Sequence, residues 1–304
     1  MAQLDGNGEA DLTPLVDALR GRQVVVLAGA GCSTESGIPD YRGGNGRKRG
    51  RPPIQYQEFV RSAEGRARYW ARSAVGWPRF SAARPNDGHR ALAQLEAAGV
   101  ACGVITQNVD GLHHAAGSLA VVELHGSLAF VRCLDCGETE PRADLQRRIL
   151  SLNGAWARVA RLHGGSSVRS APDGDAELPA ELVASFHVPD CAACGGMLKP
   201  DVVLFGENVP AERVRAAWQL FDAADVLLVV GSSLTVYSGR RFIHRAAQAG
   251  VPVAIVNEGP TRADDVACVK VDARLGSTLP RLADALIGTG RIARSHRAAP
   301  RRTP

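Results

Sequence analysis

The sequence predicts a doubly wound parallel α/β sheet that is interrupted by a small inserted lobe and by a helical insertion. Continuous apolar runs rich in valine and leucine alternate with helical patterns along most of the chain. Such runs are typical of strands buried on both faces, and their alternation with helices indicates a sheet that helices cover on both sides. Two Cys-x-x-Cys pairs, Cys133/Cys136 and Cys191/Cys194, lie in a stretch where this alternation stops.

The apolar runs and the helical periodicity between them locate the individual elements. We expect strands at Val24–Ala28, Cys102–Ile105, Val121–Leu124, Val226–Val230, Val253–Val256 and Val266–Val271. We expect helices at Thr13–Arg20, Gly88–Ala97, Ala211–Ala223, Gly239–Ala249 and Ser277–Ile287.

These elements predict a division into domains. A Rossmann-like domain covers residues 13–128 and 201–290 and carries, at about 43–85, a basic loop followed by an aromatic-bearing helical insertion. The small domain with the cysteine pairs covers residues 129–200. We expect the ends, residues 1–12 and the basic stretch 291–304, to be flexible tails.

Composition narrows the class of protein. The chain has 304 residues, of which 45% are hydrophobic, and this suits a globular protein. Its net charge is +5, and residues 291–304 hold five arginines and no acid, so subtracting five leaves a body of formal charge zero. That balance argues against a nucleic-acid-binding face. With no apolar run of about 18 residues and no targeting segment, we expect a cytoplasmic location without a membrane span.

The four paired cysteines predict one structural zinc site. Cys133, Cys136, Cys191 and Cys194 offer four thiolates, and a glycine follows each pair, as in a zinc knuckle. A four-cysteine site leaves no open position for a substrate, so the metal would support the fold. A redox-active Cys-x-x-Cys is the alternative, and the two glycine-flanked copies favour zinc.

The candidate chemistry gathers at the carboxyl ends of the strands, where open α/β sheets bind ligands. Gly29-Ala30-Gly31 follows the first strand and would let a phosphate approach the backbone, with Ser33 or Thr34 capping the next helix. Gln107, Asn108 and Asp110 follow the second strand and could recognise an amide or a ribose. An ordinary glycine turn and an Asx turn are the alternatives for these two segments.

His125 follows the third strand and is the best-placed candidate for a general base. Its ordinary pKa of about 6.5 suits proton transfer near neutral pH, although a lone histidine is more often structural. Gly231-Ser232-Ser233 and Asn257-Glu258-Gly259 end two further strands. Both segments suit ribose and adenine contacts, and both are equally compatible with ordinary turns.

Taken in order, these motifs resemble those of the sirtuins, a family of NAD-dependent protein deacylases. The matching segments are GAGCSTESGIPDYR, TQNVDGLH, ELHG, CLDC, CAAC, LKPDVVLFGE, GSSLTVYS and VNEGPTRADD, and they extend over about residues 13–288. RSAEGRARYWARSAVGWPRF and CLDCGETEPR are similar to the class II branch, which includes a mitochondrial member in animals. The richness in arginine and alanine indicates a bacterial homologue.

The resemblance implies the parts of an active site. His125 would be the general base, with Asn108 and Asp110 beside the nicotinamide and its ribose. Val202, Val203, Leu204, Phe205, Gly206 and Glu207 would offer a backbone edge to which an acyl-lysine peptide adds as a strand. The remaining NAD contacts would come from Gly29, Ala30, Gly31, Ser33, Thr34, Gly37, Ile38, Pro39, Asp40, Tyr41, Arg42, Gln107, Val109, Gly231, Ser232, Ser233, Asn257, Glu258, Gly259 and Leu275.

The same resemblance implies the reaction. The acyl group of a lysine would move to ADP-ribose, with release of nicotinamide and of O-acyl-ADP-ribose. The family's usual phenylalanine in the loop motif is Tyr41 here, and the pair that selects acidic acyl groups has no clear counterpart, although Arg68 and Tyr69 lie in the right region.

Other functions compete with this reading. A mono-ADP-ribosyltransferase would use the same residues with a different acceptor. A non-catalytic module that binds NAD or nucleic acid is disfavoured by the uncharged body and by the placed histidine. An ordinary dehydrogenase is disfavoured because no acidic residue follows a second strand about 20 residues after the glycine turn.

Overall fold

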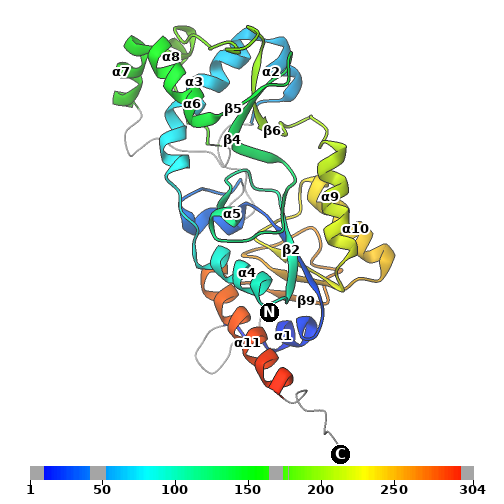
Figure 1. Ribbon diagram of the computed structural model, residues 1–304. Coiled ribbons are helices and arrows are strands. Elements are labelled where there is room, and N and C mark those ends of the chain that lie inside the picture. Colours follow the sequence, from blue (N-terminus) through cyan, green and yellow to red (C-terminus); the bar gives the residue numbers. More distant parts are fainter. Residues whose placement is uncertain (1–9, 42–52, 164–173, 177, 296–304) are drawn as a thin grey trace, which may run out of the picture.

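A computed structural model of the protein describes residues 10–41, 53–163, 174–176 and 178–295. The basic loop at 43–51, Arg42, the first nine residues and most of the expected C-terminal tail fall outside the described residues. Figure 1 shows two stacked parts, a larger one around a parallel sheet and a smaller one around an antiparallel sheet.

The larger sheet has six strands, all parallel, in the order β3-β2-β1-β7-β8-β9. The strands are β1 (Val24–Ala28), β2 (Ala101–Thr106), β3 (Val121–Glu123), β7 (Val226–Val230), β8 (Val253–Val256) and β9 (Val269–Val271). From β1 the strand order runs outward in one direction to β3 and from β7 in the other direction to β9. The switch point therefore lies between β1 and β7, which is where doubly wound sheets bind ligands.

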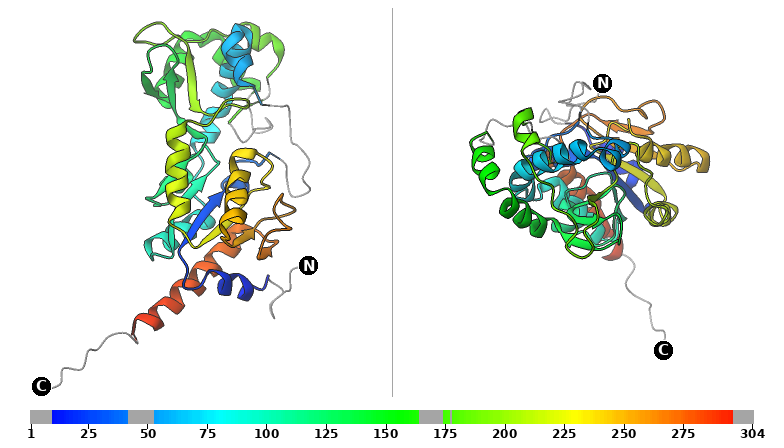
Figure 2. Two further views of the ribbon diagram at one scale, coloured as in Figure 1. Left: turned by 90° about the vertical axis from the view of Figure 1, so that its right-hand side faces the viewer. Right: turned by 90° about the horizontal axis from the view of Figure 1, so that it is seen from above.

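Helices cover both faces of this sheet because its strands are apolar on both sides (Figure 2). Val24, Val26 and Ala28 of β1 join the core on one face, and Val25 and Leu27 join the core on the other. The first face carries α1 (Thr13–Leu19), α4 (Asp87–Ala97) and α11 (Leu275–Ser295), and the second carries α9 (Ala211–Asp222) and α10 (Tyr237–Ala249). Each fully buried valine or leucine contributes about 1.5–3 kcal/mol.

The smaller sheet has three antiparallel strands in the order β5-β4-β6. They are β4 (Gly126–Cys133), β5 (Thr139–Pro141) and β6 (Leu198–Val202), and the adjacent helices are α6 (Arg142–Leu152), α7 (Gly154–His163) and α8 (Ala180–Ala184). The predicted helical insertion forms α2 (Tyr56–Arg61) and α3 (Ala63–Ser81). Phe59 and Trp70 of these helices share a core with Leu128 and Val131 of β4, so the insertion packs on the small sheet.

A buried arginine joins α3 to α6 inside this smaller core. The guanidinium of Arg142 lies 5.5 Å from the ring centroid of Trp70 and 4.9 Å from that of Trp77. Its two terminal nitrogens donate to Oε1 of Gln146 and to Oγ of Ser73. The buried charge is thus hydrogen-bonded, as burial requires.

Two expectations about local structure are wrong. The strand expected at Val266–Val271 begins only at Val269, because the N–H groups of Val266 and Ala267 donate to the Ala263 carbonyl and keep this part of the chain in a turn. The helix after β1 is a short 3-10 helix, η1 (Ala30–Ser36), whose N-cap is Gly29, so neither Ser33 nor Thr34 caps it. Among the described residues, no helix combines the length and the apolar character needed to cross a membrane.

Candidate active site

The glycine turn after β1 lies against the end of β7. The backbone N–H of Gly31 donates to the carbonyl of Gly231 at 2.8 Å. A Cβ at Gly29 would lie 2.7 Å from that carbonyl oxygen, and one at Gly31 would lie 2.8 Å from Cα of Gly231. Only glycine fits this close packing of the turn on the end of β7, which places the turn at the switch point of the sheet.

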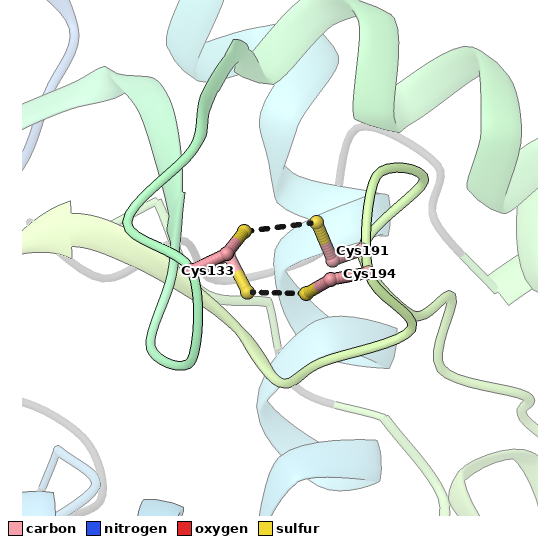
Figure 3. Close-up of side chains that lie close together, drawn as sticks. Cys133, Cys191 and Cys194 are labelled. Carbon is pink, nitrogen blue, oxygen red and sulfur yellow. Dashed lines mark hydrogen bonds between the residues drawn. The ribbon is translucent and has the colours of Figure 1, made fainter.

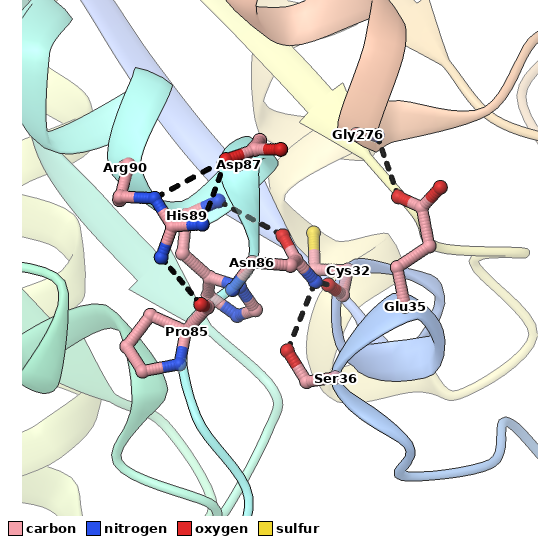
Figure 4. Close-up of polar contacts among 9 residues, drawn as sticks. All are labelled: Cys32, Glu35, Ser36, Pro85, Asn86, Asp87, His89, Arg90 and Gly276. Atoms are coloured by element: carbon pink, nitrogen blue, oxygen red, sulfur yellow. Dashed lines mark hydrogen bonds and ion pairs between the residues drawn. The ribbon is translucent and has the colours of Figure 1, made fainter.

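Helix η1 is fixed from two sides, by Asn86, which lies outside the predicted motifs, and by its own Glu35 (Figure 4). Asn86, the N-cap of α4, donates from Nδ2 to the Cys32 carbonyl at 2.7 Å and to Oγ of Ser36 at 3.0 Å. Glu35 accepts the backbone N–H of Gly276 at 2.6 Å, at the start of α11. Burial raises the pKa of the Cys32 thiol to about 12, so this cysteine is no nucleophile.

Three polar side chains from the ends of β1 and β2 form one hydrogen-bonded group. Oγ of Ser33 donates to Oδ2 of Asp110 at 2.6 Å, and Nδ2 of Asn108 donates to Oγ of Ser33 at 3.1 Å and to the Gly29 carbonyl at 3.0 Å. Oδ1 of Asp110 accepts the N–H of Leu112 and starts α5 (Leu112–Ala115). Asp110 therefore forms the Asx turn expected as an alternative for this segment, and its second carboxylate oxygen contacts Ser33 of η1.

Gln107 connects β2 to the loop after β7. Its Nε2 donates to Oγ of Ser232 at 2.8 Å, and its backbone carbonyl lies 2.8 Å from Nδ1 of His125. The other imidazole nitrogen, Nε2, lies 2.7 Å from Oγ of Ser238. The structure thus brings the expected base next to Gln107, and it adds Ser238, which the sequence did not single out.

The surroundings of His125 keep its imidazole neutral. Burial lowers the pKa of His125 below its ordinary value, the hydrogen bond to the Gln107 carbonyl opposes this shift, and the cationic side chains of Arg241 and Arg213 add to the lowering. A neutral imidazole near pH 7 is the form that can accept a proton. Close by, burial followed by the charge of Asp110 raises the pKa of Glu123 to about 7.

The other candidate NAD residues lie around the same end of the sheet. Ser233 shares a hydrogen bond with Thr235 at 3.1 Å, and Asn257 donates to the carbonyls of Glu258 and Gly259 at 3.0 Å. Leu275 is buried at the start of α11, within reach of Gly231. The segments after β7 and β8 are therefore ordered turns.

The segment after η1 leads toward the small sheet. Gly37 has φ +84° and ends η1, Ile38 is buried, and Pro39 and Asp40 are half-buried. The ring of Tyr41 meets the ring of Phe205 edge-on, with centroids 6.1 Å apart.

The expected peptide edge, residues 202–207, follows β6. Val203 donates its N–H to the carbonyl of His125 at 2.8 Å, and the Phe205 carbonyl accepts the N–H of Tyr56 at 2.8 Å. Leu204 and Glu207 close a turn by two hydrogen bonds, from Leu204 N to Oε2 of Glu207 and from Glu207 N to the Leu204 carbonyl. Phe205 and Gly206 are exposed at this turn.

The four paired cysteines meet at one end of the small sheet (Figure 3). The sulfurs of Cys133 and Cys194 are 3.6 Å apart, those of Cys136 and Cys191 are 3.9 Å apart, and all four lie within 4.8 Å of one another. Tetrahedral zinc with Zn–S bonds of about 2.3 Å needs sulfurs about 3.8 Å apart. The two loops are alike: Gly137 and Gly195 have φ near +75° and donate to the carbonyls of Cys133 and Cys191. The donor set fits one structural zinc.

Comparison with protein families now identifies the chain, since the model of the Sir2 family matches residues 29–238. The chain belongs to the Sir2 family. The matched range includes the glycine turn, His125, all four cysteines and Ser238.

Curated sirtuins from distant organisms are similar over most of this chain. The NAD-dependent protein deacetylase 1 of Streptomyces coelicolor is 54% identical over 92% of this chain and 91% of its own length. The enzyme of the same name from Mycobacterium avium is 52% identical over 92% of this chain and 97% of its own length. The human mitochondrial NAD-dependent protein lipoamidase sirtuin-4 is also 52% identical, covering 85% of this chain and 81% of its own.

Solved sirtuin structures share the fold. A Sir2–p53 peptide–NAD⁺ complex is 29% identical, covers 93% of this chain and 99% of its own, and has a TM-score of 0.66. A Sir2 enzyme bound to a propionylated peptide is 30% identical with the same coverage and a TM-score of 0.69.

Sequence reasoning missed Asn86, Glu35 and Ser238 at this sirtuin site. Asn86 had a usable signal, because it stands three residues before His89 and the two form a capping box at the start of α4. Glu35 and Ser238 lie inside two of the quoted motifs, but their partners are far away in the sequence, so the motifs alone did not show these contacts.

Proposed function

We propose that this sirtuin is an NAD-dependent protein-lysine deacylase that moves the acyl group of a lysine to ADP-ribose and releases nicotinamide. The observation that carries the proposal is the placement of half-buried His125 at the carboxyl end of the parallel sheet, beside the Ser33–Asn108–Asp110 group. The activities by which its relatives are named, protein deacetylase and lipoamidase, are of the same class.

The residues at the switch point fit NAD. The turn at Gly29–Gly31 lies at the switch point between β1 and β7, where a diphosphate could approach its backbone. The carboxylate of Asp110 and the side-chain amide of Asn108 offer an acceptor and a donor of the kind a nicotinamide carboxamide needs. Ser232, Ser233, Asn257, Gly259 and Leu275 would take the adenosine side, and residues 37–41 would lie over the ligand.

When bound, NAD supplies a ribose carbon, C1′, that loses nicotinamide and takes up the acyl oxygen of the substrate. The protein's task is to orient both reactants and to move one proton. Nδ1 of His125 is held by the Gln107 carbonyl, so Nε2 is the nitrogen that would accept a proton from a ribose hydroxyl. Closure of the two parts around the reactants would exclude water from that step.

Residues 202–207 would receive the peptide. An acyl-lysine peptide would add as a strand beside this segment, with main-chain hydrogen bonds giving affinity. Phe205 and Tyr41 would then lie where the peptide edge meets the NAD loop, since their rings are in contact. Zinc would fix the cysteine-bearing loops and would take no part in the chemical step.

The test is nicotinamide release with NAD and a panel of acetyl-, propionyl- and lipoyl-lysine peptides. His125→Ala should lower kcat about 10²–10⁴-fold, the usual contribution of a general base. The control is His114→Ala, which removes an exposed histidine and should keep wild-type turnover. Mass spectrometry should find O-acyl-ADP-ribose. ADP-ribose attached to protein would instead indicate a mono-ADP-ribosyltransferase, and full turnover by His125→Ala would refute the role of His125.

A further inference from the structure

Within the described part of the chain, Ser238 makes the only side-chain hydrogen bond to the nitrogen that would act as the base. Its Oγ lies 2.7 Å from Nε2 of His125, while the Gln107 carbonyl lies 2.8 Å from Nδ1. A carbonyl can only accept a hydrogen bond, so Nδ1 carries the imidazole proton and Nε2 carries the lone pair. The hydroxyl of Ser238 must therefore donate to Nε2 in the resting enzyme.

The loop that delivers Ser238 has an unusual backbone conformation. Leu234 has φ +55°, and it is the one non-glycine residue with positive φ in the described part of the chain. Its side chain is 1% exposed, and its N–H donates to Oγ of Ser232. A bulky residue stays in this region only where its surroundings hold it, and such residues cluster at functional sites.

Gln107 fixes the other side of this arrangement. Its side chain donates to Ser232 and packs against Gly239, where a Cβ would lie 2.5 Å from Oε1 of Gln107. The residue after Ser238 must therefore be small. Gln107 thus contacts His125 through its backbone and the Ser238 loop through its side chain, so both partners of the imidazole share one support.

A hydroxyl suits this position because it can both donate and accept. It donates to the lone pair of neutral Nε2. Nε2 has one lone pair, so a ribose hydroxyl that donates to it must displace the serine hydroxyl. Once Nε2 has taken the proton, the serine hydroxyl can rotate and accept from the new N–H. The imidazole would then have a partner before and after the transfer, and it would keep its orientation in both protonation states.

We propose that Ser238 is a positioning residue that orients the imidazole of His125 before the proton transfer and holds it again afterwards. This inference rests on the proposed function, because it assigns Ser238 a part in the step that His125 performs.

The test compares three full-length variants with NAD and an acylated peptide. Ser238→Ala should lower kcat about three- to tenfold, the effect of losing one hydrogen bond of ordinary strength, with KM for NAD and peptide unchanged. Ser238→Thr keeps the hydroxyl and should restore most of the turnover. Tyr237→Phe removes an exposed hydroxyl one residue earlier on α10 and should behave as wild type.

A measurement without substrate separates this inference from the proposed function. With ¹⁵N-labelled histidine, the Nε2 signal of His125 should shift in Ser238→Ala and stay in place in Tyr237→Phe. An unshifted signal, or an Ser238→Ala enzyme with wild-type kcat, would overturn the role of Ser238 while leaving deacylation intact. A wild-type enzyme that releases no nicotinamide would instead overturn the proposed function, whatever the signal does.

Discussion

The hydroxyl of Ser33 donates a 2.6 Å hydrogen bond to Oδ2 of Asp110. This contact ties the short helix after β1 to the loop after β2, two segments 77 residues apart. Asn108 donates to the same Ser33 oxygen, so one hydroxyl orients both polar side chains that we assign to the nicotinamide end of NAD.

Removing that hydroxyl should therefore weaken NAD use more than the fold. Ser33→Ala leaves Asp110 and Asn108 each with one partner, so we expect kcat/KM for NAD to fall about tenfold, equivalent to about 1.4 kcal/mol. Steady-state kinetics at saturating peptide would measure it. Ser277→Ala is the control, because that exposed hydroxyl only donates to the Arg274 carbonyl. Equal kcat/KM values for NAD in Ser33→Ala and wild type would refute the assignment.

Loss of zinc should abolish activity through the fold of the small sheet. Zinc binding at a structural site stabilises the folded state by about 10–16 kcal/mol, and a small lobe that loses this stabilisation unfolds. We expect Cys194→Ser to bind less than one zinc per chain, to lose amide protection in β4 and β6, and to release no nicotinamide. Hydrogen exchange and metal analysis would show this.

Cys268→Ser is the matched control for zinc, because Cys268 is an exposed free thiol outside the four-cysteine group. It should keep metal, protection and turnover. A zinc-free protein that remained fully active would contradict the supporting role of the metal.

His113 should make the protein less stable in acid. Its side chain is 1% exposed and its ring lies 4.8 Å from that of His89. Neither ring nitrogen of His113 has a hydrogen-bond partner within the described chain. Burial, with smaller contributions from His89 and His114, lowers the pKa of His113 to about 3.

The sign of the effect follows from proton binding. Below pH 6.5 the unfolded chain binds a proton at this histidine that the folded chain excludes, so stability falls as the pH drops from about 6.5 towards 3. Between pH 7 and pH 5 the loss should be about 2 kcal/mol. In urea unfolding, the free energy of unfolding of His113→Phe should fall by about 2 kcal/mol less than that of wild type between pH 7 and pH 5. The exposed variant His114→Phe should follow the wild-type curve. Parallel curves for wild type and His113→Phe would disprove the explanation.

The strands of the large sheet were the most predictable part of the fold. The runs Val24–Ala28, Val226–Val230 and Val253–Val256 match β1, β7 and β8, because strands buried on both faces must be apolar throughout. The cysteine spacing likewise predicted the four-sulfur group. In both cases the chemistry needs a local pattern that a sequence displays directly.

Contacts over long sequence distances could not be predicted in this way. Ser238 and His125 are 113 residues apart, and Asn86 reaches Ser36 across 50 residues. The packing of α3 on the small sheet also depends on tertiary contacts, since its aromatic residues would suit any core. The expected caps at Ser33 and Thr34 failed because η1 starts earlier, at Ala30, where Gly29 approaches Gly231.

The hydrogen bond from Val203 to the His125 carbonyl has a mechanical consequence. The chain passes between the two sheets from β3 to β4 and again from β6 to α9. This hydrogen bond joins these two connections. If the small sheet swings relative to the large one, this junction serves as a pivot and moves least, while points such as the cysteine loops travel furthest. The enzyme could then admit and release bulky protein substrates by a wide swing at its far end without displacing its base.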